Sequence, residues 1–384
     1  MSEETSIEQT GGVSNVSNVS NVSNVSNVST PIPDPTLGRD PVRIPFKFHG
    51  DGGEFFRIWI VNIVLSILTL GIYSAWAKVR TKRYFYGNTE LDGDRFDYLG
   101  DPVAILVGRI LAIVLLVFYQ ALLGFAPSFF SGLIGLLFLA ALPWVIYRAL
   151  RFNAQMSSWR GIRFGFDGGW VGAAKAYLLW PLFGLVTLGF GMPYAWFKQN
   201  QYLLSNYRFG ASTSTSTTEP NDFYLVALAV FGFASFGGLV LFGFTSSLGF
   251  NGMASDGEFN FDALFALGGL FAGALYFVFY VMIFAVYEAR YFSTVYNNIE
   301  ISGNYVGTSV SIVGLGRIVV GNAVLMLVTL GLYYPWARVR MTQYLQDNLW
   351  IDAVDLDSFV AKSSDGNDPL GEEIGEAFDI GIGL

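Results

Sequence analysis

Seven long apolar segments constrain this chain more than any other feature of its sequence. Each has about the twenty residues that a helix needs to cross a bilayer. Apolar residues make up 53% of the 384 residues and charged residues only 14%, against about 25% in ordinary soluble domains. This composition excludes a nucleic-acid-binding protein, a disordered scaffold and an ordinary soluble enzyme. The segments cover residues 55–77, 103–123, 129–150, 171–196, 222–245, 262–290 and 313–337.

The two ends of the chain are expected to flank a membrane domain that covers residues 41–351. Residues 1–40 are polar and repeat Ser-Asn-Val between Ser14 and Val28, which predicts a disordered segment. The repeat creates Asn-Val-Ser acceptor sites, so a glycosylated tether and a repeat expansion without a role both stay open. Residues 352–384 account for the whole net charge of −8, and we expect a flexible acidic tail there.

A Thr-Leu-Gly motif occurs three times, around Thr69, Thr187 and Thr329, and predicts an internal repeat. The first and third copies align without a gap, whereas the middle copy is two residues longer before its Trp. Seven residues separate Asn62 from Thr69 and Asn322 from Thr329, which places each pair on one helix face. Such a face predicts either a polar pathway or hydrogen bonds between helices.

Basic residues bracket the first and third motif segments, and the paired bases are 21 residues apart. This spacing equals about 31 Å of helix, close to the hydrocarbon thickness of a bilayer, and predicts that these segments span it. Seven spans divide the bases 8 to 14, so the N-terminus is expected outside and the C-terminus inside. The alternative makes the motif segments re-entrant and puts all 22 bases on one side. We favour seven spans, because Gly71 to Lys78 is too short for a helix to leave the bilayer centre.

Short strand-like stretches precede several apolar segments. Residues 45–50, 95–100 and 163–168 alternate in polarity and then break at Gly, and Asp92-Gly93 has the chemistry of a hairpin turn. We expect residues 299–313 to supply similar strands. The sequence therefore predicts an all-α polytopic membrane protein with about seven transmembrane helices, a threefold internal motif and short extramembrane β-hairpins at one mouth of the bundle.

The candidate functional residues are polar or ionisable groups near membrane depth. In a transporter or channel built on internal repeats, they would form a pathway for a small or anionic solute. In the alternative, a non-transporting envelope scaffold or lipid-interacting protein, the Lys78–Arg83 cluster would contact anionic lipid headgroups. Glu288 is the sharpest candidate, because an acidic side chain cannot reach far toward the interface, and Arg290 or another base of the bundle is its expected partner. The full set is Arg57, Asn62, Thr69, Lys78, Arg80, Lys175, Glu288, Arg290, Arg317, Asn322, Thr329, Arg338 and Arg340.

No catalytic, cofactor or metal site is expected. The chain has no Cys and one His, His49, so thiol chemistry, Fe–S clusters and His-based metal clusters are excluded. It also lacks the phosphate-binding loop, the zinc-protease motif and the nucleophile elbow. The expected partner is the lipid bilayer, with no nucleic acid and no cofactor.

Several residues carry a resemblance to a known family: Phe48-His49-Gly50, Gly53 to Phe56, Leu68 to Tyr73 with Trp76, Lys78-Val79-Arg80, Gly87-Asn88-Thr89 and Leu91-Asp92-Gly93 with Phe96. They resemble the YjgN family of prokaryotic inner-membrane proteins of unknown function. The similarity covers about residues 43–350, and the middle motif copy departs from it because it lacks the Asn and the second Arg. The resemblance implies a multi-pass protein of the cytoplasmic membrane with an inward C-terminus, and it implies no substrate.

Overall fold

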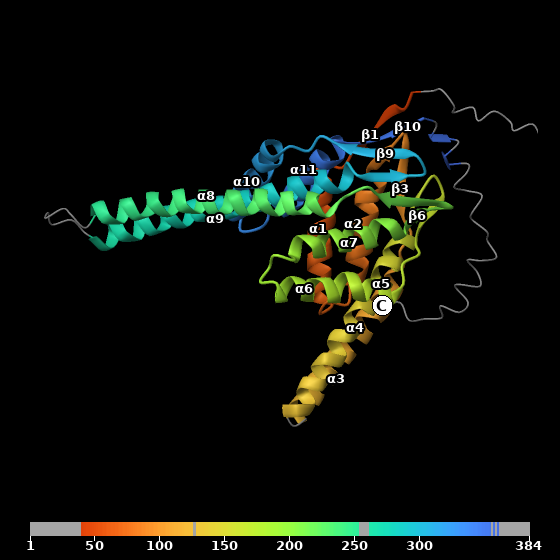
Figure 1. Cartoon of the computed structure of the whole chain (residues 1–384), viewed down its shortest axis with the longest axis horizontal. Coiled ribbons are helices and arrows are strands. Elements are labelled where there is room, and N and C mark those ends of the chain that lie inside the picture. Colours follow the sequence, from red (N-terminus) through yellow and green to blue (C-terminus); the bar gives the residue numbers. More distant parts are fainter. Residues whose placement is uncertain (1–39, 126–127, 253–260, 355, 358, 361–384) are drawn as a thin grey trace, which may run out of the picture. The chain divides into compact units, whose positions relative to one another are not determined.

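The computed structural model describes residues 40–125, 128–252, 261–354, 356, 357, 359 and 360 (Figure 1). The Asn-Val-Ser array and most of the predicted acidic tail lie outside these residues. Along the described chain, pairs of strands alternate with pairs of helices. The predicted all-α fold is wrong, because the strands close into one antiparallel barrel.

Ten short strands form this barrel in the described part of the chain. Successive strands pair with each other, and β1 completes the barrel by pairing with both β2 and β10. The register pairs Val42 at the start of β1 with Ala353 at the end of β10. The strands are β1 (Val42–Phe48), β2 (Thr89–Leu91), β3 (Asp94–Tyr98), β4 (Ser157–Trp159), β5 (Ile162–Phe166), β6 (Tyr207–Phe209), β7 (Ser212–Ser216), β8 (Ile299–Ile301), β9 (Asn304–Thr308) and β10 (Leu349–Ala353).

Tight turns join the strands at one rim of the barrel. Asp92-Gly93 joins β2 to β3 with φ angles of 53° and 83°, and Arg160-Gly161 and Ser302-Gly303 adopt the same left-handed conformation. A two-residue turn of this kind matches the twist of paired strands and favours Gly at its second position. Because the strands turn back at this rim, the helices leave from the opposite rim.

Two long helical hairpins contain the helices that can cross a membrane. They are α3 (Pro102–Phe125) with α4 (Ser128–Gln155), and α8 (Pro220–Gly252) with α9 (Phe261–Tyr296), and both extend away from the strands in Figure 1. At most 11% of each apolar span is buried by the rest of the described protein, as expected of helices that face lipid. The four candidate spans are Pro102–Gly124, Phe130–Gln155, Pro220–Ser246 and Gly269–Tyr296.

The three motif segments form short helical hairpins, so the prediction of about seven spans is wrong. Each chain reversal falls at the Thr-Leu-Gly motif, and the 21-residue spacing between bases therefore runs around a turn. Since β1 pairs with β10, the N-terminal and C-terminal strands of the described chain lie on the same side of the membrane domain. The short hairpins are α1 (Gly52–Leu68) with α2 (Ser74–Gly87); α5 (Trp170–Ala174), a π-helical stretch (Lys175–Leu179) and α6 (Trp180–Val186) with α7 (Met192–Asn206); and α10 (Ile312–Val328) with α11 (Tyr334–Asp347).

Aromatic side chains fill the interior of the barrel. Phe96 stacks on Trp159 with ring centroids 6.0 Å apart. Phe359 belongs to the segment expected as a flexible tail, yet it stacks on Phe209 at 5.5 Å. The described interior is therefore a packed apolar core. Its buried members are Leu91, Trp159, Ile162, Phe209, Ile351, Ala353, Leu356 and Phe359.

The helices leave the barrel at the rim opposite the turns and pack against one another in a closed ring. Each helix contacts the next one along the chain, and α11 contacts α1. Each long hairpin lies between two short ones, and the ring closes where the third short hairpin contacts the first. This arrangement brings the second helix of the first short hairpin, α2, against the first long hairpin.

Candidate functional site

Each Thr-Leu-Gly motif builds the same kind of turn between two helices. Thr69 Oγ1 donates a hydrogen bond to the carbonyl of Leu65 at 2.7 Å and accepts one from the backbone N–H of Tyr73 at 2.9 Å. Thr187 and Thr329 make equivalent bonds in the other two copies. The threonine hydroxyl is therefore engaged within its own hairpin in all three copies.

Each turn also presents a leucine in the left-handed conformation. Leu70, Leu188 and Leu330 have φ angles of 51°, 54° and 50°, and they are 94%, 89% and 92% exposed. Gly71 follows at φ 92°, and its N–H bonds the carbonyl of Ser66 at 2.7 Å, which completes a Schellman motif. Leucine costs about 1–2 kcal/mol in a position that glycine usually takes. The chain thus tolerates backbone strain while each tip exposes an apolar side chain.

A buried asparagine links the two helices of the first and third hairpins. Asn322 Nδ2 donates to the carbonyl of Ala337 at 3.1 Å, and its Oδ1 accepts from Arg340 Nη1 at 3.4 Å. Asn62 donates to the carbonyl of Ala77 at 3.4 Å, and its buried Oδ1 has no partner among the described residues. Both predicted asparagines therefore lie between the helices of one hairpin.

Asn322→Ala is expected to lower the free energy of unfolding by about 1–3 kcal/mol, because it leaves the carbonyl of Ala337 without its side-chain donor. Asn62→Ala should cost less, since the bond that it removes is longer and the Asn62 oxygen is already unpaired. Thermal unfolding of both purified variants in one detergent checks this order. An equal or larger loss in Asn62→Ala would contradict the assigned roles.

Three cations gather where the first short hairpin meets the first long hairpin. Lys78 and Lys82 lie four residues apart on α2 and share one helix face. Arg109 of α3 donates a hydrogen bond to Ser74 Oγ, one turn before Lys78 on that face. Lys82 Nζ donates to Asn153 Oδ1 of α4 at 2.6 Å. We call Lys78, Lys82 and Arg109 the cationic stripe.

The cationic stripe carries positive charge that no ion pair compensates. Among the described residues, none of its three members pairs with a carboxylate. Burial lowers the pKa of Lys78, and the nearby Arg109 guanidinium lowers it further. Burial and the neighbouring Lys78 likewise lower the pKa of Lys82. An anion placed between these groups would relieve their repulsion and favour their charged forms.

The other predicted residues are spread over the helices and do not meet at one site. Glu288 is half-buried on α9, and no ion pair joins it to Arg290 or to another described base. Arg338 Nη1 donates to the hydroxyl of Tyr334 at 2.8 Å. The remaining bases are exposed: Arg57, Arg80, Lys175, Arg290, Arg317 and Arg340.

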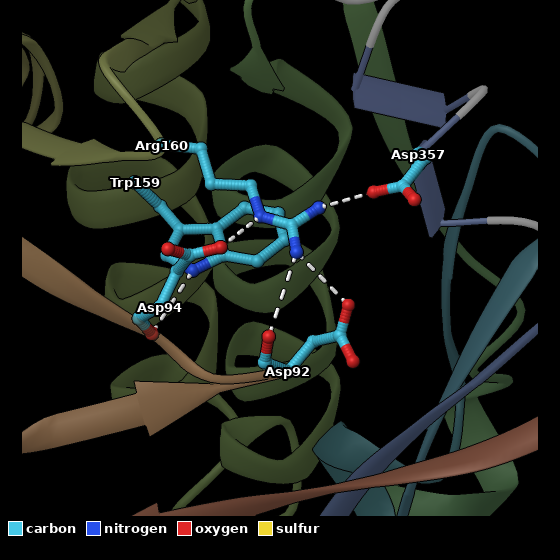
Figure 2. A network of polar contacts seen from close by, with 5 residues as sticks. All are labelled: Asp92, Asp94, Trp159, Arg160 and Asp357. Carbon is cyan, nitrogen blue, oxygen red and sulfur yellow. Dashed lines mark hydrogen bonds and ion pairs between the residues drawn. The ribbon is translucent and has the colours of Figure 1, made fainter.

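Figure 2 shows an arginine network at the turn rim of the barrel that the sequence prediction misses. Arg160 Nη2 pairs with Asp92 Oδ2 at 2.9 Å, and Nε pairs with Asp94 Oδ2 at 2.5 Å. Its Nη1 pairs with Asp357 Oδ1 at 2.8 Å, beyond the end of β10. The guanidinium also lies 4.8 Å from the ring centroid of Trp159. The network connects two turns to the segment after β10, which is a structural role at the barrel mouth.

The sequence prediction also misses Arg109 and Asn153 as members of the site. No pattern in the sequence sets the register between α2 and the long hairpin, so their approach to Lys82 and Ser74 is visible only in the fold. One signal was present: Arg109 is an ionisable residue inside an apolar segment, and such residues are functional candidates.

Comparison with known proteins places the chain in a family. Residues 43–377 match the family model "Bacterial protein of unknown function (DUF898)". The chain is 34% identical over 198 residues to inner membrane protein YjgN of Escherichia coli O157:H7, and 32% identical over 197 residues to that of Escherichia coli strain K12. Each match covers 50% of this chain and 45% of the relative. The YjgN protein of Salmonella typhimurium strain LT2 is 33% identical over 142 residues, which cover 37% of this chain and 34% of the relative.

The chain spans less than half the length of the curated relatives that it matches. No solved structure matches it. The relatives are named inner membrane proteins, in agreement with the four apolar helices, and neither their names nor the family description gives an activity. The resemblance noted in the sequence is confirmed: this membrane protein belongs to the DUF898 family, whose curated relatives here are the YjgN proteins.

Proposed function

We propose that this protein binds anionic phospholipid at the cytoplasmic surface of the membrane and carries no solute across it. The observation on which the proposal rests is that the three cations of the stripe lie together and pair with no carboxylate among the described residues. Lys and Arg side chains near a membrane surface gain about 1 kcal/mol each from anionic lipids. The proposed role is binding at this stripe, without a catalytic step.

The distribution of basic residues supports a barrel in the cytoplasm. None of the 22 Lys and Arg residues lies at positions 110–147 or 209–289, which include the ends of the long hairpins farthest from the barrel in the chain. Basic residues concentrate on the cytoplasmic side of membrane proteins. The barrel, and with it the C-terminal strand β10, is therefore assigned to the cytoplasm.

The leucine tips support insertion of the short hairpins into the cytoplasmic leaflet. Helices α1 and α10 have 17 residues each, or about 25 Å, which is less than the thickness of the hydrocarbon core. The N–H groups of Leu70, Gly71 and Ile72 all bond to carbonyls of their own hairpin, as a turn in lipid requires. Helix α2 then returns toward the surface, where long basic side chains can reach the headgroups.

Transport of a small or anionic solute is the competing function. A route along the barrel axis would need polar, open space, whereas the described barrel interior is packed with apolar and aromatic side chains. The buried Asn62 and Asn322 each form a hydrogen bond within their own hairpin. These bonds do not join the two asparagines into one polar pathway. These observations favour lipid binding over conduction.

The double variant Lys78→Gln/Lys82→Gln is expected to lose about thirtyfold in selectivity for phosphatidylglycerol over phosphatidylcholine. Two lysines at about 1 kcal/mol each account for this factor. Electron paramagnetic resonance of spin-labelled lipids, with the protein in nanodiscs, measures the selectivity. Because the pKa of both lysines is lowered, the selectivity of the native protein should fall as the pH rises, starting at lower pH than for an isolated lysine.

The matched control is Lys47→Gln/Arg95→Gln, which removes two exposed bases from the barrel strands and leaves the cationic stripe intact. This control should keep the native lipid selectivity. Equal losses in the two double variants would show that only overall charge matters and would refute the site. Transport would instead be supported if an anion entered vesicles that contain the native protein and did not enter vesicles that contain Lys78→Gln/Lys82→Gln.

A further inference from the structure

We propose that a second phospholipid site lies in the groove between α9, α10 and α11, with an acyl chain along the helices and the lipid phosphate on Arg338. The groove is open on one side and has a volume of about 820 Å³, within the range of about 300–1,000 Å³ that is common for small-molecule sites. This inference rests on the proposed lipid-binding function, but it assigns a site that shares no residue with the cationic stripe.

Three helix faces form the walls of the groove. Helix α9 contributes residues from Phe277 to Phe284 at intervals of three and four, which lie on one face. Helix α10 contributes Ala323 and Met326, which are three residues apart, and α11 contributes Ala337 and Met341, which are four residues apart. Each face runs for about two turns, or about 10 Å. The two alanines keep the floor low, so the groove has the elongated, apolar form that suits an acyl chain.

The groove lies at membrane depth. Its α9 wall falls within the candidate span Gly269–Tyr296. Tyr280 and Phe284 in this wall are 72% and 46% exposed, so the described chain leaves them largely uncovered. Inside a bilayer the surroundings of such a wall are lipid tails. An acyl chain is therefore the occupant whose chemistry and location both match.

Arg338 supplies the polar end of the site. It is the one charged residue that lines the groove among the described residues. Its Nη1 bonds the hydroxyl of Tyr334, and its guanidinium lies 4.9 Å from the ring centroid of Phe85. A guanidinium has five N–H donors, and no described carboxylate pairs with this one. The remaining donors suit a phosphate, which guanidinium groups bind in a bidentate manner.

The direction of the lipid follows from the direction of the helices. Helix α11 runs from the leucine tip back toward the barrel, so Thr342 lies nearer the membrane surface than Arg338. Met326 lies at the end of α10 that approaches the tip. A lipid with its phosphate between Arg338 and Thr342 therefore extends its chain toward Met326, deeper in the leaflet.

Phosphatidylglycerol with a photoreactive diazirine on one acyl chain tests the site, using the full chain in nanodiscs and peptide mapping by mass spectrometry. We expect crosslinks in α9–α11, and we expect Ala323→Phe to reduce them at least about tenfold by filling the groove. The matched control is Val324→Phe, on the next residue of α10, which is 42% exposed and does not line the groove. The control should crosslink like the native protein.

Arg338→Gln changes an exposed side chain and separates a headgroup site from simple lipid contact. It should reduce the preference for phosphatidylglycerol over phosphatidylcholine at the α9–α11 crosslinks about fivefold, while Lys78→Gln/Lys82→Gln leaves these crosslinks unchanged. Native lipid selectivity in Lys78→Gln/Lys82→Gln would refute the proposed function and leave the groove site in place. Native crosslinking in Ala323→Phe or an unchanged preference in Arg338→Gln would overturn the groove site.

Discussion

A cysteine at Gly124 is expected to react with a membrane-impermeant maleimide in intact cells, whereas one at Ala211 should react only after the cells are permeabilised. The chain has no native cysteine, so each variant carries a single reporter. Gly124 lies at the far end of the span that begins at Pro102, and Ala211 lies in the β6–β7 turn of the barrel. The difference should be close to all or none, because the proposed topology assigns the two positions to opposite sides of the bilayer.

The same labelling tests the number of spans and the orientation separately. Labelling of both cysteines in intact cells would show that the first long hairpin does not cross the membrane. Labelling of Ala211→Cys alone would put the barrel outside, against the distribution of basic residues. A third cysteine at Leu330 should stay unreactive even in permeabilised cells, because the hairpin tip is assigned to the lipid.

Trp159→Ala should lower the free energy of unfolding by about 3–5 kcal/mol, the usual cost of removing a large buried aromatic side chain. Trp159 is 3% exposed inside the barrel and contacts the rings of Phe96 and Phe209. The cavity would open in a core to which most strands contribute, so the packing has few ways to collapse. Loss of far-ultraviolet circular dichroism on heating in detergent measures the effect as a lower apparent melting temperature.

Trp350→Ala is the matched control for this substitution. Trp350 lies in β10, where it stacks under the Arg43 guanidinium at 4.0 Å and donates its indole N–H to Asp352 Oδ2 at 3.1 Å. It is half-buried and lies outside the buried cluster in the barrel interior. Its removal should cost about 1 kcal/mol or less. Equal melting temperatures for the two variants would contradict the assignment of Trp159 to the barrel core.

The local patterns in the sequence were informative about single elements. Alternation over residues 45–50 and 95–100 coincides with strands β1 and β3, and Asp92-Gly93 forms the turn that its chemistry predicts. Closure of the barrel was not predictable in this way. Several strands have only three residues, and the pairing of Val42 with Ala353 joins opposite ends of the domain without any local signal.

The error in the number of spans has an identifiable cause. An apolar window over residues 55–77 appears continuous because Ile72 and Tyr73 continue it, although Leu70-Gly71 reverses the chain. Glycine after a helix is a stop signal, and here it marks the end of α1 more accurately than the length of the apolar window does. The short distance from Gly71 to Lys78 does not limit the return path, because α2 begins at Ser74, continues to Gly87 and carries its bases along its length.

The candidate site was predictable only in part. The basic end of the motif marks Lys78 as a candidate, and the sequence leaves contact with anionic lipid and a solute pathway as its two possible roles. Its partners depend on the packing of α2 against α3 and α4, which side-chain spacing along one helix does not specify. Equivalent residues also diverge between hairpins: Asn322 bonds Arg340, whereas the oxygen of Asn62 has no described partner.

The meeting of β1 with β10 also constrains how the protein is made. The first strand leaves the ribosome long before Leu349–Ala353, and the two long hairpins are synthesised in between. Both hairpins can therefore enter the bilayer while the sheet is still open and its aromatic residues lack their final neighbours. Completion of the barrel is a late step of high contact order, which is intrinsically slow and exposes unpaired strand edges until it occurs.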